Sequence, residues 1–345
     1  MSMLFFDGFD GYDGIADAYN YGGWSQVNFY GVNLASVGRS GSGKGVALAA
    51  DHTMGYSLGS AFSGKTWYIG FAMKIVSNTT SGIVIEFQET LSSSRFVTQC
   101  FLHYNNLEKK LELKKGDYTY STVLATSSMS LIEDTWYYIE VKFLCDSVSG
   151  VFELKTNESV VASYTGNTQY KATDNIASIY FGGFITADIN IDDVYILNSD
   201  GAINNTYLGD VQCTLTYPSA DYSTTFTPTG AVSNYLCVDD ALGNPDDDTT
   251  YVSSSTVGNI DEYSLPNIVA SEVHAVKVNT RAMKDDVNPR NMKHGIRTGT
   301  NANETEYVLG EGYGNYINVY DDQGDGTPWD ETSFNAARSM IKVQS

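Results

Sequence analysis

The segment GRSGSGKG, residues 38–45, comes nearer than any other stretch to a known catalytic motif. Gly38 and Gly43 have the spacing of a phosphate-binding loop, and Lys44 follows directly. Such a loop needs Ser or Thr at the next position to bind Mg²⁺, but this chain has Gly45 there. It must also open a helix, whereas the apolar stretch that follows is short and soon broken by another glycine. The glycines therefore predict a tight turn between two strands.

Paired carboxylates on a β-sandwich would be typical of an enzyme that cleaves polysaccharides. Glu86 and Glu89 are three residues apart, which places them on opposite faces of a strand. Glu140 and Glu153 alternate with apolar neighbours, so both are expected to face solvent. The four histidines are His52, His103, His274 and His294. None has a Ser, Cys or carboxylate pattern beside it that would indicate a triad, and the sequence favours a protein that is not an enzyme.

Acidic clusters supply the oxygen ligands that Ca²⁺ takes in proteins. The candidates are Asp7 with Asp10, Asp192 with Asp193, Asp246 to Asp248, and the segment DDQGDG at residues 321–326. The last segment begins like an EF-hand loop, but its twelfth position is Thr332 where that loop needs Glu. Asp and Gly are equally the ordinary residues of turns. Bound Ca²⁺ and simple turn formation both stay open, and no other cofactor is indicated.

Aromatic residues are concentrated in two loops that are rich in Gly and Asn. The first, DAYNYGGW at residues 17–24, contains Tyr19, Tyr21 and Trp24. The second, GYGNYINVY at residues 312–320, contains Tyr313, Tyr316 and Tyr320. Exposed aromatic side chains stack on sugars or anchor protein interfaces. The first three residues are our candidates for binding a glycan, and the second three are candidates for a protein interface.

The charge balance excludes some classes of partner. The formal net charge is −21, and residues 172–276 contain fifteen acidic side chains but no Lys or Arg. Because nucleic-acid binders need basic patches, nucleic acid is not an expected partner, and neither is an anionic membrane. No apolar run reaches the length of a membrane span, and the first ten residues lack the pattern of a signal peptide. The four cysteines have no metal-binding spacing and are expected to be reduced thiols.

Alternation of apolar and polar residues predicts a protein built almost entirely of β-strands. In the first part of the chain the expected strands are residues 66–76, 81–89, 136–144, 150–156, 177–185 and 189–198, with a hairpin at 110–121 that turns at Lys115-Gly116. A polar segment at residues 199–209 predicts a domain boundary near residue 200. Beyond it, strands are expected in DVQCTLTYP, TTYVSSS, EVHAVKVNT, TEYVLGEG and YINVYDD. The clearest helix is residues 332–341, with Ser333 as its N-cap.

Several segments resemble the concanavalin-A-like, laminin-G-type jelly-roll domains of tailed-bacteriophage virion proteins. They are LFFDGFDGY, GRSGSGKGVAL, WYIGFAMKI, DTWYYIEVKF and INIDDVYILNSDG. The region after residue 200 and the closing segment PWDETSFNAARSMIKV also look like the continuation of those phage proteins. The resemblance implies an all-β fold: a jelly-roll sandwich over residues 1–200, then a smaller β-rich virion-attachment or interaction domain over residues 201–345 with one short C-terminal helix. It carries over scaffold positions only.

The resemblance implies a non-enzymatic structural component of a phage particle, a capsid decoration or a tail-associated protein. Such a protein would be displayed as a homo-oligomer, would contact other virion proteins, and would be assembled in the host cytoplasm before becoming part of the virion. One alternative is a glycan-binding adhesin that grips host-surface carbohydrate through Tyr19, Tyr21 and Trp24, with or without Ca²⁺. A further alternative is a polysaccharide-degrading enzyme.

Overall fold

The computed structural model divides into two compact units, each of which is described by itself. It describes residues 2–27, 32–35, 38–41, 43–49, 52–62, 64–77, 80–92, 95–171, 173, 175–182 and 188–345. The N-terminal unit runs from Ser2 to Cys213 and the C-terminal unit from Thr214 to Ser345. The division therefore lies at Cys213/Thr214, beyond the boundary predicted near residue 200. The predicted all-β fold class, with a sandwich followed by a second β-rich region, is confirmed.

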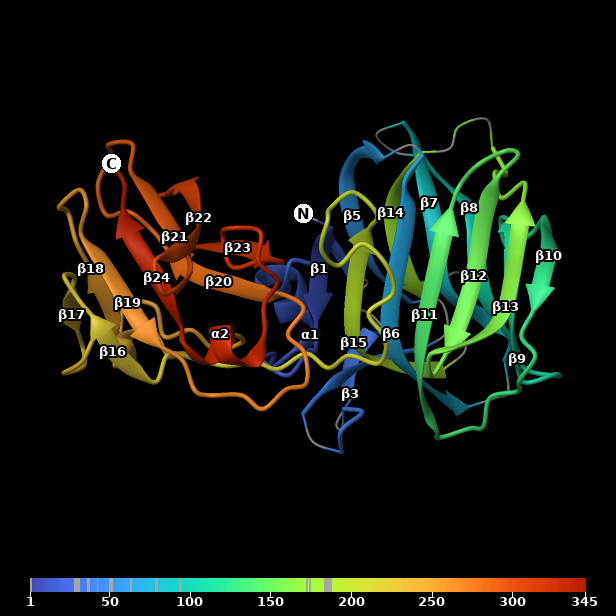
Figure 1. The fold of residues 1–345 in the computed structure, drawn as a ribbon, viewed down its shortest axis with the longest axis horizontal. Coiled ribbons are helices and arrows are strands. Elements are labelled where there is room, and N and C mark those ends of the chain that lie inside the picture. Colours follow the sequence, from blue (N-terminus) through green and yellow to red (C-terminus); the bar gives the residue numbers. More distant parts are fainter. Residues whose placement is uncertain are drawn as a thin grey trace. The chain divides into compact units, whose positions relative to one another are not determined.

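The N-terminal unit consists of two antiparallel sheets that face each other (Figure 1). Sheet 1 has the order β13 (Ser159–Gly166), β12 (Gly150–Thr156), β11 (Trp136–Leu144), β6 (Thr66–Ser77), β15 (Asp188–Asn198), β4 (Gly45–Leu48) and β3 (Val32–Ala35), and β1 (Met3–Asp7) also pairs with β15. Sheet 2 has the order β10 (Ser121–Thr126), β9 (Lys110–Gly116), β8 (Arg95–Asn105), β7 (Gly82–Ser92), β14 (Ile176–Gly182), β5 (Thr53–Phe62) and β2 (Gln26–Val27).

Aromatic side chains fill the space between the sheets. Phe87 of sheet 2 stacks on Phe143 of sheet 1 with ring centroids 4.2 Å apart, and Phe181 meets Phe71 edge to face at 5.1 Å. Because side chains alternate along a strand, Phe143 facing inward places Trp136, Tyr138 and Glu140 on the outer face of sheet 1. This parity decides which side chains can form a site on that face.

For most strands of the N-terminal unit, the predicted first and last residues lie within a few positions of the observed ones. The exceptions are local. The hairpin of β9 and β10 turns at residues 117–120, because the chain stays paired as far as Gly116, whose partner is Ser121. The predicted strand 177–185 is observed as Ile176–Gly182, and its remaining residues lie outside the described part of the chain.

The C-terminal unit has one larger sheet and two strand pairs. The five-stranded sheet has the order β16 (Ala220–Ser223), β19 (Ile260–Ser264), β24 (Ala337–Val343), β21 (Asn291–Thr298) and β22 (Asn301–Val308). The pairs are β17 (Thr227–Thr229) with β18 (Tyr251–Ser253), and β20 (Val276–Ala282) with β23 (Gly314–Tyr320). A small core forms where Ile296, Tyr320, Trp329 and Phe334 pack together. The predicted strand DVQCTLTYP is not observed as a strand.

The helix predicted at residues 332–341 is mostly a strand. Helix α2 covers only Glu331–Asn335, and the chain then continues as β24 between β19 and β21. The N-cap is Asp330, whose side chain accepts a hydrogen bond from the backbone N–H of Ser333. Ser333 was therefore the wrong residue for the cap but belongs to the same capping box. Pairing with two neighbours outweighs the helical pattern of residues 337–341.

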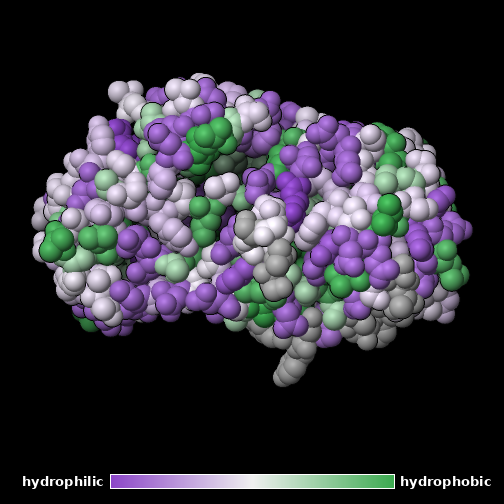
Figure 2. Space-filling model, turned by 90° about the horizontal axis from the view of Figure 1, so that it is seen from below, coloured by the Kyte–Doolittle hydropathy of each residue, from purple (hydrophilic) through white to green (hydrophobic). Residues whose placement is uncertain are grey.

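Three further features concern the cysteines, the helices and the surface. The cysteines at positions 100, 145, 213 and 237 are free thiols. No helix among the described residues is long and apolar enough to cross a membrane. Hydrophilic residues predominate on the face drawn in Figure 2, where apolar residues form small separate patches.

Candidate functional site

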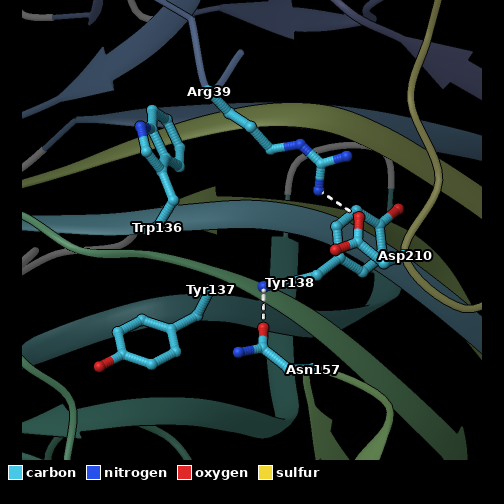
Figure 3. A pocket seen from close by; sticks show the side chains of 6 residues that line it. All are labelled: Arg39, Trp136, Tyr137, Tyr138, Asn157 and Asp210. Atoms are coloured by element: carbon cyan, nitrogen blue, oxygen red, sulfur yellow. Dashed lines mark hydrogen bonds and ion pairs between the residues drawn. The ribbon is translucent and has the colours of Figure 1, made fainter. Parts of the chain in front are cut away.

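A pocket of about 310 Å³ lies on the N-terminal unit, on the outer side of sheet 1. Its lining residues come from a turn, a strand, a hairpin and a loop, and are Arg39, Trp136, Tyr137, Tyr138, Asn157 and Asp210. Figure 3 shows Trp136 on one side of the pocket and Arg39 with Asp210 on the other. The pocket thus combines aromatic rings with polar side chains of both charges, as small-molecule sites commonly do.

Arg39 reaches the pocket from the glycine-rich turn between β3 and β4. Gly41 and Gly43 have positive φ angles of 79° and 72°, and the N–H of Gly38 donates to the carbonyl of Gly43 over 3.2 Å. The predicted tight turn is therefore confirmed, and β4 follows it directly without a helix. The turn directs the Arg39 guanidinium over the Tyr138 ring, 5.1 Å from its centroid.

Arg39 is held by three carboxylates. Its backbone N–H donates to Asp192 over 2.9 Å, and Nε lies 3.0 Å from a carboxylate oxygen of Asp193. Its terminal nitrogens pair with Asp210 and donate to the carbonyl of Val211 over 2.8 Å. Burial opposes its charge, but Asp193 and Asp210 outweigh burial and raise the pKa of Arg39. The guanidinium is consequently fixed in place and fully charged.

Asp192 and Asp193 sit at an irregularity where β15 slips its register against β6. Asp193 has a φ of 47°, and this bulge turns both carboxylates toward the Arg39 turn. Burial and the neighbouring Asp193 charge raise the pKa of Asp192 to about 7. Burial raises the pKa of Asp193 to about 6, although the Cys213 N–H and Arg39 oppose the shift. These two acids therefore hold protons at pH values where exposed aspartates have lost them.

Residues 199–213, which we call the strap, lie across the outer face of sheet 1. Tyr207 donates its hydroxyl to Glu153 over 3.0 Å, and the N–H of Gly209 donates to Glu140 over 2.9 Å. The N–H of Cys213 donates to Asp193 over 2.7 Å. The strap thereby covers part of the outer face, and its residue Asp210 forms one wall of the pocket.

Trp136 and Asn157 offer hydrogen-bond donors that no other described residue uses. Asn157 lies in the hairpin between β12 and β13, and its side-chain oxygen accepts from the Tyr138 N–H over 2.8 Å. Its NH₂ group makes no hydrogen bond within the described part of the chain, and neither does the indole N–H of Trp136. The Trp136 ring is half-buried, with Lys74 Nζ 5.4 Å from its centroid. The pocket thus has an accessible ring and two available donors.

Trp24 is not the exposed platform that its sequence neighbours suggested. Its side chain is only 1% exposed, packs against Phe5 at 4.7 Å and donates its indole N–H to Asp7 over 2.7 Å. Its assignment to a glycan site is therefore wrong, because the ring belongs to the core between the sheets. Tyr19 is 53% exposed and Tyr21 half-buried, so the structure leaves these two without the third member of the predicted site.

The tyrosines predicted as a protein interface divide in a similar way. Tyr320 is buried and donates its hydroxyl to the carbonyl of His294 over 3.3 Å, so its assignment to an interface is wrong. Tyr313 donates to Asp248 over 3.0 Å and lies under Arg281. Tyr316 is half-buried and packs on a neighbouring tyrosine ring at 5.0 Å. The loop of residues 312–320 therefore contacts the acidic segment around Asp248 within the same unit.

Three of the four carboxylates considered in the sequence are buried, among them Glu140, which was expected to face solvent. Glu140 accepts the Tyr195 hydroxyl over 2.6 Å under the strap. Glu86 accepts a hydrogen bond from the Thr98 hydroxyl over 2.8 Å. Burial raises the pKa of Glu86 and outweighs this hydrogen bond, which lowers it. Glu89 is also buried, with Gln99 among its donors. A strand face predicts solvent exposure only where nothing covers it, and here other segments and side chains do.

His103 is not isolated, contrary to the sequence prediction. Its Nδ1 lies 3.2 Å from Glu112, which also pairs with Lys114 at 3.0 Å and accepts from Asn105 over 2.8 Å. Burial, assisted by Lys114, lowers the pKa of His103 to about 4, so the ring is neutral near pH 7. Because these four side chains satisfy one another across β8 and β9, we interpret them as a structural network.

The acidic clusters proposed for Ca²⁺ have internal partners. Asp7 accepts from Tyr12 and Trp24, while Asp247 pairs with Arg281. In the segment at residues 321–326, Asp325 accepts the N–H of Thr327 over 2.9 Å, as a turn residue does. Among the described residues, no three side chains of His, Cys, Asp or Glu gather as a metal site.

No protein-family model and no curated protein matches this sequence. Several solved structures are distantly similar to it. A Bacillus subtilis protein of unknown function with a galectin-like fold is 9% identical, with a TM-score of 0.38, over 57% of this chain and 96% of that chain. Domain 4 of AbnA, a GH43 extracellular arabinanase from Geobacillus stearothermophilus solved with arabinotriose, is 12% identical, with a TM-score of 0.38, over 57% and 93%.

The Trypanosoma rangeli sialidase, solved with sialic acid, is 10% identical with a TM-score of 0.35 over 48% of this chain and 27% of that chain. This chain therefore spans about a quarter of the length of the sialidase. These likenesses are distant and concern the β-sandwich fold alone. The resemblance to phage virion proteins is not tested by these comparisons and stays a prediction.

Proposed function

We propose that the N-terminal unit binds a neutral oligosaccharide in the pocket beside Trp136. The observation that carries the proposal is the half-buried indole ring with two unused donors, its own N–H and the Asn157 amide, opposite the half-exposed carboxylate of Asp210. A sugar ring presents a C–H face that packs on an aromatic ring and hydroxyls that bond to planar polar groups. The pocket supplies both kinds of contact within one small volume.

The charge of the molecule favours a neutral ligand over an anionic one. The chain has a formal net charge of −21, and the one guanidinium at the pocket is already bound by Asp193 and Asp210. A sialylated or sulfated sugar would therefore meet repulsion that the Lys74 ammonium, 5.4 Å from the centroid of the Trp136 ring, offsets only in part. We accordingly expect chains of neutral hexoses or pentoses.

The proposal is for binding and not for catalysis. Asp192 and Asp193, the acids nearest the pocket's arginine, are turned toward Arg39 and toward backbone N–H groups. A place on a virus particle, as the sequence resemblance implies, is part of the same proposal. There, many copies would strengthen weak individual contacts through avidity.

Isothermal titration of the protein with a panel of neutral oligosaccharides tests the proposal. Trp136→Ala should weaken binding by tenfold or more, since a central aromatic side chain contributes about 2 kcal/mol or more. Asn157→Asp keeps the oxygen that Tyr138 needs but removes the donor, so it should weaken binding with the fold intact. Tyr19→Ala is the matched control and should have no effect.

Two results would contradict the proposal. If no neutral glycan binds, the pocket does not have this function. If Tyr19→Ala abolishes binding and Trp136→Ala does not, the ligand lies at the loop of residues 17–24, as one sequence alternative holds.

A further inference from the structure

The two sheets of the N-terminal unit end in strands that lie at the same end of the sandwich. These are β13 in sheet 1 and β10 in sheet 2, at the right of the unit in Figure 1. The N–H of Ser128, just after β10, donates to the carbonyl of Val161 in β13 over 2.8 Å. Within the described part of the chain, both strands pair on one side only, β13 with β12 and β10 with β9. An edge strand of this kind presents N–H and C=O groups that another strand can use.

Both edges lack charged side chains. Residues 118–132 contain no Asp, Glu, Lys, Arg or His, and the same is true of residues 159–170. Charged residues make up 18% of the chain, so a run of fifteen would carry about three of them. Proteins usually protect exposed edges with charges, above all with Lys, or with Pro. These edges have neither, which is unexpected in so acidic a protein.

Apolar and hydroxyl side chains on β10 and beside it are open to solvent. Tyr120 is 72% exposed and Val123 48%, and Ser121 and Thr122 between them are also exposed. On the neighbouring edge, Val160 is 54% exposed. The residues are β-branched, aromatic or small and polar, which are the types that favour strand pairing. The end of the sandwich therefore has the composition of a strand interface.

We propose that β10 pairs antiparallel with β10 of a second copy of this chain, about a two-fold axis close to Thr122 and Val123. Antiparallel pairing of a strand with itself is self-complementary, so one uncharged edge serves both partners. Two chains of net charge −21 repel each other over most of their surfaces, and contact is favoured where no charge is present. Of the two edges, β10 is the freer, because Ser128 already occupies one carbonyl of β13.

The pairing goes beyond the proposed glycan function and does not depend on it. The residues of the pocket belong to other elements than β10 and β13. If no glycan binds, the proposed pairing can still be correct. If the protein does not dimerise, the proposed glycan binding can still be correct.

Sedimentation velocity of the full chain over a range of micromolar concentrations tests the inference. The wild-type protein should form a reversible dimer, and Val123→Lys should raise its dissociation constant at least tenfold, because two ammonium groups would then face each other. Val148→Lys is the matched control: Val148 is 79% exposed but lies in the turn before β12. It should leave the dimer unchanged. Near-UV circular dichroism of each variant checks that the fold is retained.

A cysteine placed at the axis supplies a second readout. Single substitutions to Cys at positions 121 to 125 should give a disulfide-linked dimer under mild oxidation, with one position more efficient than its neighbours. A monomer at all concentrations, a ring of three or more chains, or a dimer that Val123→Lys does not weaken would each overturn the inference. Cross-linking only through the native Cys213 would overturn it as well.

Discussion

Asp192 and Asp193 are the residues whose protonation should couple most strongly to folding. They lie buried at a bulge, with Asp10, Asp210 and the Arg39 guanidinium as the charged groups around them. Their pKa values of about 7 and about 6 are above the value of 3.8 that applies when they are exposed. Between pH 3.8 and these raised pKa values, the folded protein holds protons that the unfolded chain has released. The free energy of unfolding must therefore fall as pH rises through this range.

We expect the free energy of unfolding to decrease between about pH 4 and about pH 7 by up to roughly 7 kcal/mol, because the two pKa values lie about three and about two units above 3.8 and each unit corresponds to about 1.4 kcal/mol. Asp192→Asn should flatten this slope, since an amide does not titrate. Urea unfolding at a series of pH values measures it, and Glu108→Gln, which alters an exposed acid, should keep the wild-type slope. An unchanged slope in Asp192→Asn would show that the carboxylate ionises freely in the fold.

The two tryptophans Trp24 and Trp136 show what residue types alone can predict. The loop around Trp24 has Gly, Asn and Tyr neighbours, which are typical of exposed binding loops, yet the ring is buried against Phe5 and bound to Asp7. Trp136 stands at the start of a recognisable strand, where alternation already places it opposite the core-facing Tyr137 and Ile139. That signal was present in the sequence, but Arg39, Asn157 and Asp210 reach the pocket from other segments, so the pocket itself was not predictable.

At the scale of elements, the turn that carries Arg39 is bound to the strap through Asp210 and the carbonyl of Val211. The turn between β3 and β4 was predictable because its glycines need positive φ angles. Its role was not, because Arg39 contacts Asp193 and Asp210, which lie more than 150 residues further along the chain. The predicted helix at residues 332–341 failed for a related reason, since β24 gains two strand partners that are invisible locally.

Arg39→Ala should loosen the strap and leave Asp193 buried without its cation. The strap contains Tyr207 but no Lys or Arg, so chymotrypsin cleaves it while trypsin has no site there. We expect chymotryptic cleavage at Tyr207 to become about tenfold faster or more in Arg39→Ala, as a loss of roughly 1.4 kcal/mol in local stability implies. Lys44→Ala, in the same turn, is the control, because Lys44 contacts Asp13 and not the strap. Equal cleavage rates in all three proteins would mean that the strap does not depend on Arg39.

At the scale of the whole molecule, some features could be predicted from the sequence and others could not. The composition predicted an acidic surface. The alternation of apolar and polar residues, which recurs through the chain, predicted the all-β class. The position of the division between the units was harder to predict. Residues 201–213 are polar and rich in turns like a linker, but they satisfy buried groups of the sandwich through Glu140, Asp193 and Arg39.

The boundary can be tested with two fragments, residues 2–213 and residues 2–200. The shorter one lacks the Gly209 N–H that Glu140 accepts, the Cys213 N–H that Asp193 accepts, and the Asp210 partner of Arg39. Leaving buried charges without partners costs about 3–5 kcal/mol, which corresponds to a melting temperature lower by about 10 °C for a unit of this size. Thermal unfolding followed by circular dichroism should show that loss in the shorter fragment, while the longer one melts as the N-terminal unit does in the full chain. Equal melting temperatures for the two fragments would instead support the boundary near residue 200 and make the strap a linker.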